Sequence, residues 1–468
     1  MAQQLADAYG NVFCIRLGRD TTVFVSGYKM VKEALVTQAE NFMDRPDNPM
    51  QLYNAFPRLM KSLPGPQNAI FSLLKSLEAF IRGEIERHKV DLDPNNSRDY
   101  IDTFLMEEKL EENREVGFYE GNLVLCCLAQ NSLQNVTVFS GRPFNPHYIL
   151  KSAVGNVISA VVFGHRFEYS DEGFQNLLRL DNEAVLLAGT ARAQLYDAFP
   201  GLLNYLPGPH QTIHSNYRKI VAFLQMEIQK HQEEWNPEDP QDYIDTYLAE
   251  IEKRKGDPHA GFNTETLTIC TLDLFEAGTE TAATTLRWAL VFMMNYPEIQ
   301  EKVQAEIDRV IGQSRQPTIA DRPNLPYTDA VNHETQRMGN IVPLGFPKMA
   351  GKDATLGGYF IPKGTAISVN LSSVLFDKNE WETPDTFNPE HFLDSEGQFR
   401  RREAFLPFSA GKRACLDEHL ARMELFVFFA SLLQLFTFTP VPGEMPSLEG
   451  VMGFTYSPEE FKILAMPR

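Results

Sequence analysis

The chain has few cysteines and no excess of positive charge. Its 468 residues include five Cys, which are scattered and form no Cys-x-x-Cys pair. This spacing argues against a disulfide framework and against a structural zinc site. Lys and Arg number 43 against 62 Asp and Glu, a formal net charge of −19. Such a balance argues against a nucleic-acid-binding protein and against broad attachment to anionic lipid.

The start of the chain also has no long hydrophobic run. The first ten residues contain no apolar stretch long enough for a signal peptide or a membrane-spanning helix, so we expect no N-terminal anchor. The overall composition, 43% hydrophobic and 22% charged, is ordinary for a globular protein. The chain is long enough to bury a large core, and disorder is not expected.

Hydrophobic periodicity predicts the secondary structure. Residues 12–25 predict a β-hairpin, and residues 26–36 a short helix after it. From about residue 265 onward, apolar residues recur at helical spacing between Pro and Gly signals. We therefore expect a mainly helical protein with small β-sheets.

An internal repeat lies in the middle of the chain. Leu63-Pro-Gly-Pro66 returns as Leu206-Pro-Gly-Pro209, and Asp99-Tyr-Ile-Asp-Thr103 returns as Asp242-Tyr-Ile-Asp-Thr246. Two copies are too few for a solenoid, which needs about three or more units. We interpret residues 52–129 as a surplus copy of 195–273 within one domain, 1–468.

Cys415 lies where a loop is predicted to become a helix. The nearly unbroken apolar run 425–433 predicts a buried helix after it. A thiol near a helix N-terminus, close to Lys412 and Arg413, is expected to favour the thiolate. A lone cysteine is more often a small buried hydrophobe, so the surrounding spacing has to decide.

That spacing, Phe408-x-x-Gly411-x-Arg413-x-Cys415, resembles the haem-binding signature of the cytochrome P450 family. The resemblance implies that Cys415 is the axial thiolate ligand of haem iron, in iron protoporphyrin IX. It further implies that Arg413 pairs with a haem propionate and that Gly411 lets the loop pass close under the ring. Lys348 stands where the family commonly presents Arg or His to the second propionate; a solvated surface Lys is the alternative.

Glu334 and Arg337 are one helical turn apart, in a helix expected to begin near Pro326. Alone, such a pair is usually surface decoration. Followed by His391 downstream, it resembles the family's Glu-x-x-Arg helix and the segment that completes its buried triad. The resemblance implies a structural role for the triad, behind the haem loop.

Ala277-Gly-Thr-Glu-Thr281 interrupts a long apolar helix, expected over about 264–294, with residues that disfavour it locally. The resemblance implies that the Gly opens space over the iron and that Thr281 and Glu280 are the catalytic acid–alcohol pair. The alternative is a Thr bonded to the carbonyl four residues back, with Glu280 exposed.

The resemblance covers residues 1–48, the N-terminal β and helix portion, and 145–468, a haem domain similar to the vertebrate microsomal type of family 2, subfamily J. Between them, the family's Trp-x-x-x-Arg helix has no counterpart, because none of the three Trp lies in that context. Asp417 stands where the family prefers Gly. Glu276 adds a carboxylate close to the expected pocket.

The resemblance implies a monooxygenase that oxidises lipophilic substrates, fatty acids such as arachidonate or xenobiotics, with O2 and electrons from NADPH–cytochrome P450 reductase. It also implies the endoplasmic reticulum membrane as the location. The hydrophobic residues that the family places over the iron are Phe275, Ala277, Ile341, Val342, Leu344 and Phe454.

Two sequence features each have a functional and a purely structural interpretation. Arg400, Arg401, Arg402 and Lys412 are candidates for docking the acidic reductase, or are a solvated charge run. The segments 53–63 and 196–206 suit peripheral membrane contact, or core packing.

Two other functions remain open. One is a catalytically inactive or haem-deficient relative, from a rearranged or mis-joined gene, which the missing Trp-x-x-x-Arg helix, the surplus copy and Asp417 favour. The other is a haem-thiolate isomerase, which the presence of Thr281 and Glu280 disfavours.

Overall fold

The computed structural model describes residues 2–17, 20–46, 141–190, 192, 193, 196, 206–237, 240–255 and 261–468. The first repeat copy and the place of the missing Trp-x-x-x-Arg helix lie outside the described residues. The duplication therefore stays a prediction.

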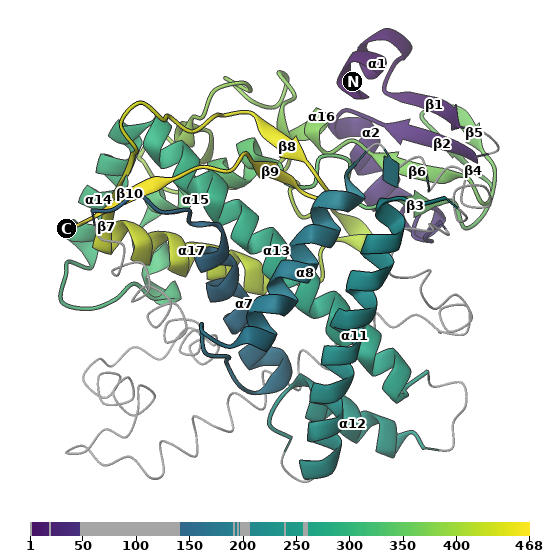
Figure 1. Ribbon diagram of the computed structural model, residues 1–468. Helices are drawn as coiled ribbons and strands as arrows, with labels where there is room; N and C mark the ends of the chain where they lie inside the picture. Colours follow the sequence, from purple (N-terminus) through teal and green to yellow (C-terminus); the bar gives the residue numbers. More distant parts are fainter. Residues whose placement is uncertain are drawn as a thin grey trace.

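Helices dominate the described chain, as the sequence predicts (Figure 1). They are α1 (Ala2–Tyr9), α2 (Tyr28–Lys32), α7 (His147–Phe163), α8 (Glu172–Ala188), α11 (Pro209–Glu234), α12 (Tyr243–Lys253), α13 (Thr264–Asn295), α14 (Pro297–Val310), α15 (Pro326–Gly339), α16 (Ser372–Leu375) and α17 (Glu418–Leu435). The predicted bounds of α13 and the predicted start of α15 are confirmed. Within the described residues, no helix is both long and apolar enough to cross a membrane.

The strands form four small sheets. They are β1 (Val12–Leu17), β2 (Asp20–Val25), β3 (Lys348–Met349), β4 (Ala354–Leu356), β5 (Tyr359–Ile361), β6 (Ala366–Val369), β7 (Phe436–Pro440), β8 (Gly450–Met452), β9 (Tyr456–Pro458) and β10 (Ile463–Pro467). The largest sheet has the order β1-β2-β6-β3, and the predicted hairpin is its β1–β2 pair, in antiparallel register. This sheet joins the start of the chain to segments more than 300 residues later.

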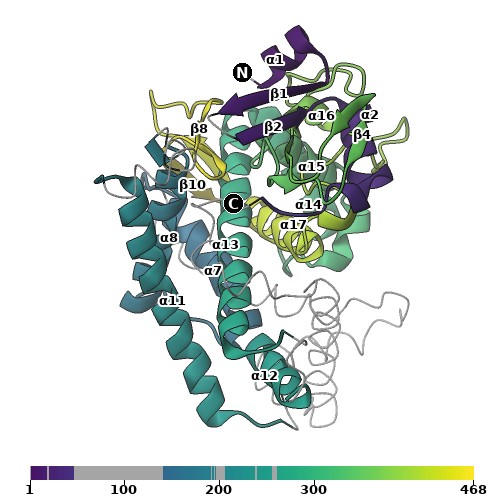
Figure 2. The same ribbon diagram turned by 90° about the vertical axis from the view of Figure 1, so that its right-hand side faces the viewer.

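Helix α13 is the centre of the helical part. In Figure 2 it runs between α7, α8 and α11 on one side and α14, α15 and α17 on the other. A helix covered on both sides must be apolar nearly all round, and most of α13 from Ala282 to Met294 is buried. Its Trp288 donates from Nε1 to the carbonyl of Tyr456 at 3.0 Å, which ties α13 to β9.

The apolar run that follows Cys415 is the buried helix α17, as predicted. Residues 425–433 are all buried, and their side chains join those of α13, α14 and α7 in the largest hydrophobic core. Truncating one of its buried Phe residues, such as Phe426, would cost about 3–5 kcal/mol. This core fixes the start of α17, and with it the loop of Cys415.

Candidate functional site

The loop of Cys415 is fixed by backbone contacts. A 3-10 turn, Gly411–Arg413, precedes the cysteine, and the Cys415 amide donates to the carbonyl of Phe408 at 2.9 Å. Gly411 has φ 73°, and a Cβ there would overlap the carbonyl oxygen of Leu35. This close approach to Leu35 and the left-handed backbone account for the glycine in the structure.

The protein around Cys415 does not favour the thiolate. Burial, together with the nearby carboxylates of Asp417 and Glu418, raises the pKa of the thiol to about 11, although the residue as a whole is exposed. Lys412 instead pairs with Glu40. The expectation of a thiolate promoted by the surrounding charges is therefore wrong for the protein alone. A coordinated metal ion would itself deprotonate the thiol.

Three basic side chains gather near this loop. Burial, and to a smaller extent the charge of Arg413, lowers the pKa of Arg45 to about 10. Burial, and to a smaller extent the charges of Arg45 and Arg413, lowers the pKa of Lys348 to about 8. Lys348 is 2% exposed, which excludes the solvated surface Lys. We call Arg45, Lys348 and Arg413 the cation cluster.

The cation cluster is bound to backbone carbonyls. Arg45 donates to Pro347 at 2.7 Å, Lys348 to Phe346 at 3.3 Å, and Arg413 to Met43 at 2.7 Å. In the described part of the chain, neither Arg45 nor Lys348 pairs with a carboxylate. Buried charges of one sign that repel one another require an opposite charge.

A haem fits this arrangement. Its two propionates would supply negative charges to Arg45 and Lys348, and Cys415, an exposed residue, offers an iron ligand. Arg45 is a residue that the sequence analysis missed, because nothing in its own segment distinguishes it. It becomes a candidate only when the fold brings it to Lys348 and Arg413.

One stripe of α13 is open. Asp273, Ala277 and Thr281 follow at intervals of four residues, and each is at least partly exposed on a helix whose middle is largely buried. Thr281 donates from Oγ1 to the carbonyl of Ala277 at 2.7 Å, which is the bland alternative for this residue. The catalytic role of Thr281 stays a prediction.

Gly278 lies at the contact between α13 and α7. A Cβ at Gly278 would lie 2.6 Å from Cδ1 of Ile158, which belongs to α7. Gly278 therefore lets α7 pack closely against α13. The expectation that it opens space over the iron is corrected.

Glu280 points into the protein. It is 6% exposed, and its Oε2 lies 2.6 Å from Nζ of Lys151 on α7. The alternative of an exposed Glu280 is therefore wrong. Its pairing with Thr281 as a catalytic acid stays a prediction.

The structure brings together Glu334, Arg337 and His391. Arg337 donates to both carboxylate oxygens of Glu334 at 2.8 Å, and His391 Nδ1 lies 3.2 Å from Oε1. Arg337 also donates to the carbonyls of Leu375 and Pro384. These bonds satisfy a buried ion pair and fasten α15 to the segment that leads to the cysteine loop.

The predicted substrate-pocket residues separate into two groups. Phe275 is 1% exposed and packs with Phe163 in the core of α7, α8 and α11, so its place in the pocket is corrected. Leu344 and Phe454 are exposed, and the rings of Phe454 and Phe346 lie 5.4 Å apart. Ile341 and Val342 are half-buried and Ala277 is exposed.

The two unexpected carboxylates have distinct surroundings. Burial raises the pKa of Asp417 to about 7, and its Oδ2 lies 3.6 Å from where a Cβ on Gly278 would be. Glu276 accepts a hydrogen bond from the Tyr217 hydroxyl at 2.5 Å, toward α11. Glu276 thus faces α11, and its expected place at the pocket is corrected.

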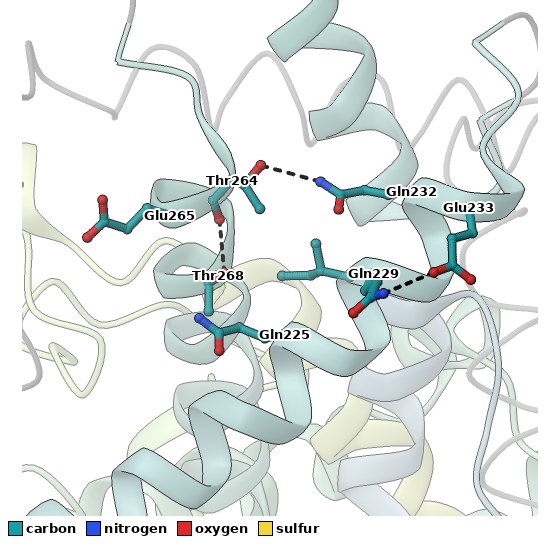
Figure 3. A pocket seen from close by; sticks show the side chains of 8 residues that line it. Gln225, Gln229, Gln232, Glu233, Thr264, Glu265 and Thr268 are labelled. Carbon is teal, nitrogen blue, oxygen red and sulfur yellow. Dashed lines mark hydrogen bonds between the residues drawn. The ribbon is translucent and has the colours of Figure 1, made fainter.

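Two other groupings of polar residues lie away from the cysteine loop. His231, Asp242 and Asp245 have the spacing of a metal site, but Asp242 already bonds His231 at 2.7 Å and caps α12 at the Asp245 amide. A recess of about 630 Å³ lies between α11 and α13 and shares no residue with the site above; Figure 3 shows the side chains that line it. Apart from Ile228, its walls consist of polar residues: Gln225, Gln229, Gln232, Glu233, Thr264, Glu265 and Thr268.

The fold and the cysteine loop define a class, the helical haem proteins. Within it, the family model described as Cytochrome P450 matches residues 1–51 and 124–465. The chain belongs to the cytochrome P450 family and is a haem monooxygenase. The family model leaves residues 52–123 unmatched.

Several relatives align over nearly the whole chain. Human Cytochrome P450 2J2 is 45% identical over 468 residues, which are 100% of this chain and 86% of that protein. Rat Cytochrome P450 2J3 is 44% identical, with the same shares covered. Human Cytochrome P450 2D6 is 41% identical over 99% of this chain and 88% of its own length. The predicted resemblance to family 2, subfamily J is confirmed.

Proposed function

We propose that this monooxygenase oxidises lipophilic small molecules, fatty acids such as arachidonate or xenobiotics, with O2 and electrons from NADPH–cytochrome P450 reductase. One observation carries the proposal: exposed apolar rings lie directly beside the cation cluster. The Phe346 ring is tilted against that of Phe454 and lies 5.9 Å from the Arg45 guanidinium, and the Phe346 carbonyl accepts a hydrogen bond from Lys348. Exposed apolar surface next to a cofactor site favours an apolar ligand.

The residues would divide the work as follows. Cys415 would ligate the iron, and Arg45, Lys348 and Arg413 would hold the propionates. The bound haem supplies the oxygen activation. Leu344 and Phe454 would exclude water from the substrate, and Thr281 with Glu280 would supply protons.

The test is the spectrum of the reduced, CO-bound protein, followed by product analysis with arachidonate and a panel of lipophilic drugs in the presence of reductase. We expect the red-shifted Soret band of thiolate ligation and oxidised products. Cys415→Ser should abolish the band. Cys14→Ser, which alters an exposed cysteine in β1, is the matched control and should leave it unchanged.

The second candidate is a haem-deficient relative. The unmatched residues 52–123 favour it. A purified protein that takes up no haem when haem is supplied would support this candidate and contradict the monooxygenase. Haem uptake with isomerised products and no O2 consumption would instead support the isomerase, which Thr281 and Glu280 disfavour.

For reductase docking, Arg401 is the most available member of the predicted patch. Arg400 and Arg402 lie at 3.4 and 3.1 Å from Glu382, and Lys412 pairs with Glu40. Because these three charges are already paired, they attract an acidic partner less strongly. Charges at the rim of an interface act chiefly on the association rate. Arg401→Glu should therefore slow reductase binding more than Arg400→Glu, as measured by flavin-to-haem electron transfer at low salt.

We also propose the endoplasmic reticulum membrane as the location. The support is resemblance to the family's microsomal type, and fractionation of cells that express the chain tests it. Of the segments proposed for peripheral membrane contact, residues 53–63 lie outside the described residues. At the ends of the other, Tyr196 is buried and Leu206 is 50% exposed.

A further inference from the structure

His231 of α11 faces two carboxylates from the start of α12. Its Nε2 lies 2.7 Å from Oδ2 of Asp242, and His231, Asp242 and Asp245 each offer one ligand atom within 4.8 Å of the others. Both aspartates are buried and His231 is largely so. We call these three residues the His-Asp-Asp cluster. It lies where α11 and α12 meet, away from the cysteine loop (Figure 2).

The imidazole of His231 is already oriented by the backbone. Its Nδ1 lies 2.8 Å from the carbonyl oxygen of Glu227, one helical turn earlier. A carbonyl only accepts hydrogen bonds, so Nδ1 carries a proton and donates it. A histidine that binds a metal ion typically donates its other ring N–H in this way, to a carbonyl or a carboxylate. His231 therefore presents Nε2 to the aspartates in the orientation of a ligand.

The two carboxylates are oriented in the same manner. Asp242 Oδ1 accepts a hydrogen bond from the Asp245 amide at 2.9 Å, and Asp245 Oδ2 accepts one from the Gln241 amide at 3.0 Å. These bonds fix both side chains while Asp242 Oδ2 faces His231. A helix cap with a His–Asp ion pair is the structural alternative, and it accounts for these contacts alone.

Glu227 adds an observation that the structural alternative does not explain. Its side chain is 2% exposed, and its Oε2 accepts no hydrogen bond from the part of the chain that the structure describes. Glu227 lies four residues before His231, on the same face of α11. Its Oε2 is 3.6 Å from Nε2 of His165, and at the preceding residue, Gly164, a Cβ would lie 2.7 Å from Oδ2 of Asp242. A buried carboxylate oxygen without a donor, beside this cluster, indicates a missing cation.

The same four residue types recur in the first copy of the repeat. Each stands 143 residues earlier in the sequence: Glu84, His88, Asp99 and Asp102. The immediate neighbours of the histidine differ, being Arg87 and Lys89 in one copy and Lys230 and Gln232 in the other. The sequence thus repeats all four potential ligands at one spacing, although the first copy lies outside the described residues.

A metal ion would have to displace one proton. Although burial opposes it, the hydrogen bond and the charge of Asp242 raise the pKa of His231 to about 9. In the metal-free protein a proton therefore lies between Nε2 and Oδ2. A divalent ion carries twice the charge of that proton and interacts more strongly with the same carboxylates.

We propose that His231, Asp242 and Asp245, with Glu227 as a fourth ligand, bind one divalent transition-metal ion, Zn²⁺ in particular. The proton between His231 and Asp242 leaves to solvent, and Nε2 and Oδ2 become ligands. Atoms bound to zinc at about 2.0–2.2 Å lie at most about 4.4 Å apart, so small side-chain rotations close the span. Imidazole favours Zn²⁺ over Ca²⁺ and Mg²⁺, which prefer oxygen ligands.

Four protein ligands would leave no open position, so the site is structural and fastens α11 to α12. No cysteine takes part, and the cysteine spacing therefore does not bear on it. The inference is also independent of haem and of the proposed oxidation.

The first experiment is equilibrium dialysis of the full chain, purified without a histidine tag, against Zn²⁺ at pH 8. We expect the wild type to bind one more zinc ion per chain than Asp242→Asn or His231→Gln. Asn caps a helix as well as Asp does, so Asp242→Asn keeps α12 and loses the anionic ligand. The affinity of the site should fall more than about a hundredfold, the most that loss of an outer partner costs. Equal zinc content in the wild type and both variants overturns the proposal, and so does displacement of the ion by excess Ca²⁺.

The matched control is His147→Asn. His147 Nδ1 lies 2.9 Å from a single carboxylate, that of Glu460, so this pair has the histidine and one acid but not the second aspartate. Its loss should leave the zinc content unchanged. If His147→Asn loses the same equivalent as His231→Gln, adventitious binding to His–carboxylate pairs explains the data and the proposal is wrong.

Thermal unfolding gives a second readout, because an ion that binds only the folded state stabilises it. Zinc should raise the melting temperature of the wild type and of His147→Asn by a few degrees, and leave that of Asp242→Asn unchanged. Circular dichroism without zinc establishes that each variant is folded, and the use of two ligand variants guards against failure of one to fold. An equal rise in Asp242→Asn would place the ion elsewhere and overturn the proposal.

Discussion

At the scale of single residues, the cation cluster has a measurable energetic cost. Lys348 is buried beside Arg45 and Arg413, and its pKa falls from 10.5 to about 8. A folded state that binds fewer protons than the unfolded one gains stability as pH rises. The destabilisation is therefore present in full below pH 8, and it decreases as the pH rises toward 10.5, the ordinary pKa of the unfolded lysine.

We predict that the haem-free protein becomes more stable between about pH 8 and 10.5, by up to about 3 kcal/mol from Lys348. Urea unfolding at several pH values measures it. Lys348→Met should lose this pH dependence of the unfolding free energy, because it removes the titrating amine. It should also bind haem more weakly, because it removes a proposed propionate partner. An identical slope in Lys348→Met would contradict the assignment.

Single-residue predictions succeeded where the partner is local. Glu334 and Arg337 could be paired from sequence, because i,i+3 spacing places them on one helical face. Arg45 and Lys151 could not, since their partners come from distant segments and only the packed fold brings them together. The same holds for Glu276, whose partner Tyr217 lies on another helix.

At the scale of elements, Gly278 shows how packing decides the use of a residue. The sequence marks it as an unfavourable residue in the interior of α13, and the family resemblance predicts that it leaves room for a cofactor. The structure places Ile158 of α7 where a side chain would be. The helix bounds followed from periodicity, but the helix–helix contact did not.

Gly278→Ala should destabilise the protein by about 1–3 kcal/mol, because the new methyl group overlaps Ile158. Adding Ile158→Ala should recover part of that loss, and thermal unfolding of the two single variants and the double variant gives the coupling. If the two stability changes simply add in the double variant, and Gly278→Ala alone loses O2 activation, the result would support the hypothesis that Gly278 opens space over the iron.

At the scale of the whole molecule, the described fold joins the first and last thirds of the chain. Strand β2 pairs in parallel with β6, as Thr22 with Ala366, and the Arg45 side chain reaches Pro347. The N-terminal portion is thus held by contacts with residues beyond 340. Sequence could predict the hairpin but not these pairings, which depend on long-range closure.

This closure gives the strongest test of the surplus copy. If residues 52–129, of which the family model leaves 52–123 unmatched, add nothing to the fold, their deletion should retain the helical circular dichroism signal and shift the melting temperature by only a few degrees. The entropy of closing the chain grows only slowly with the length of a connecting segment, so its shortening costs little. Deleting 206–255, which carries α11 and α12, is the control and should abolish folding, because Ile220, Leu224 and Ile228 are buried against α7 and α8. Loss of folding in both deletions would mean that the segment completes the core, and the interpretation of a surplus copy would be wrong.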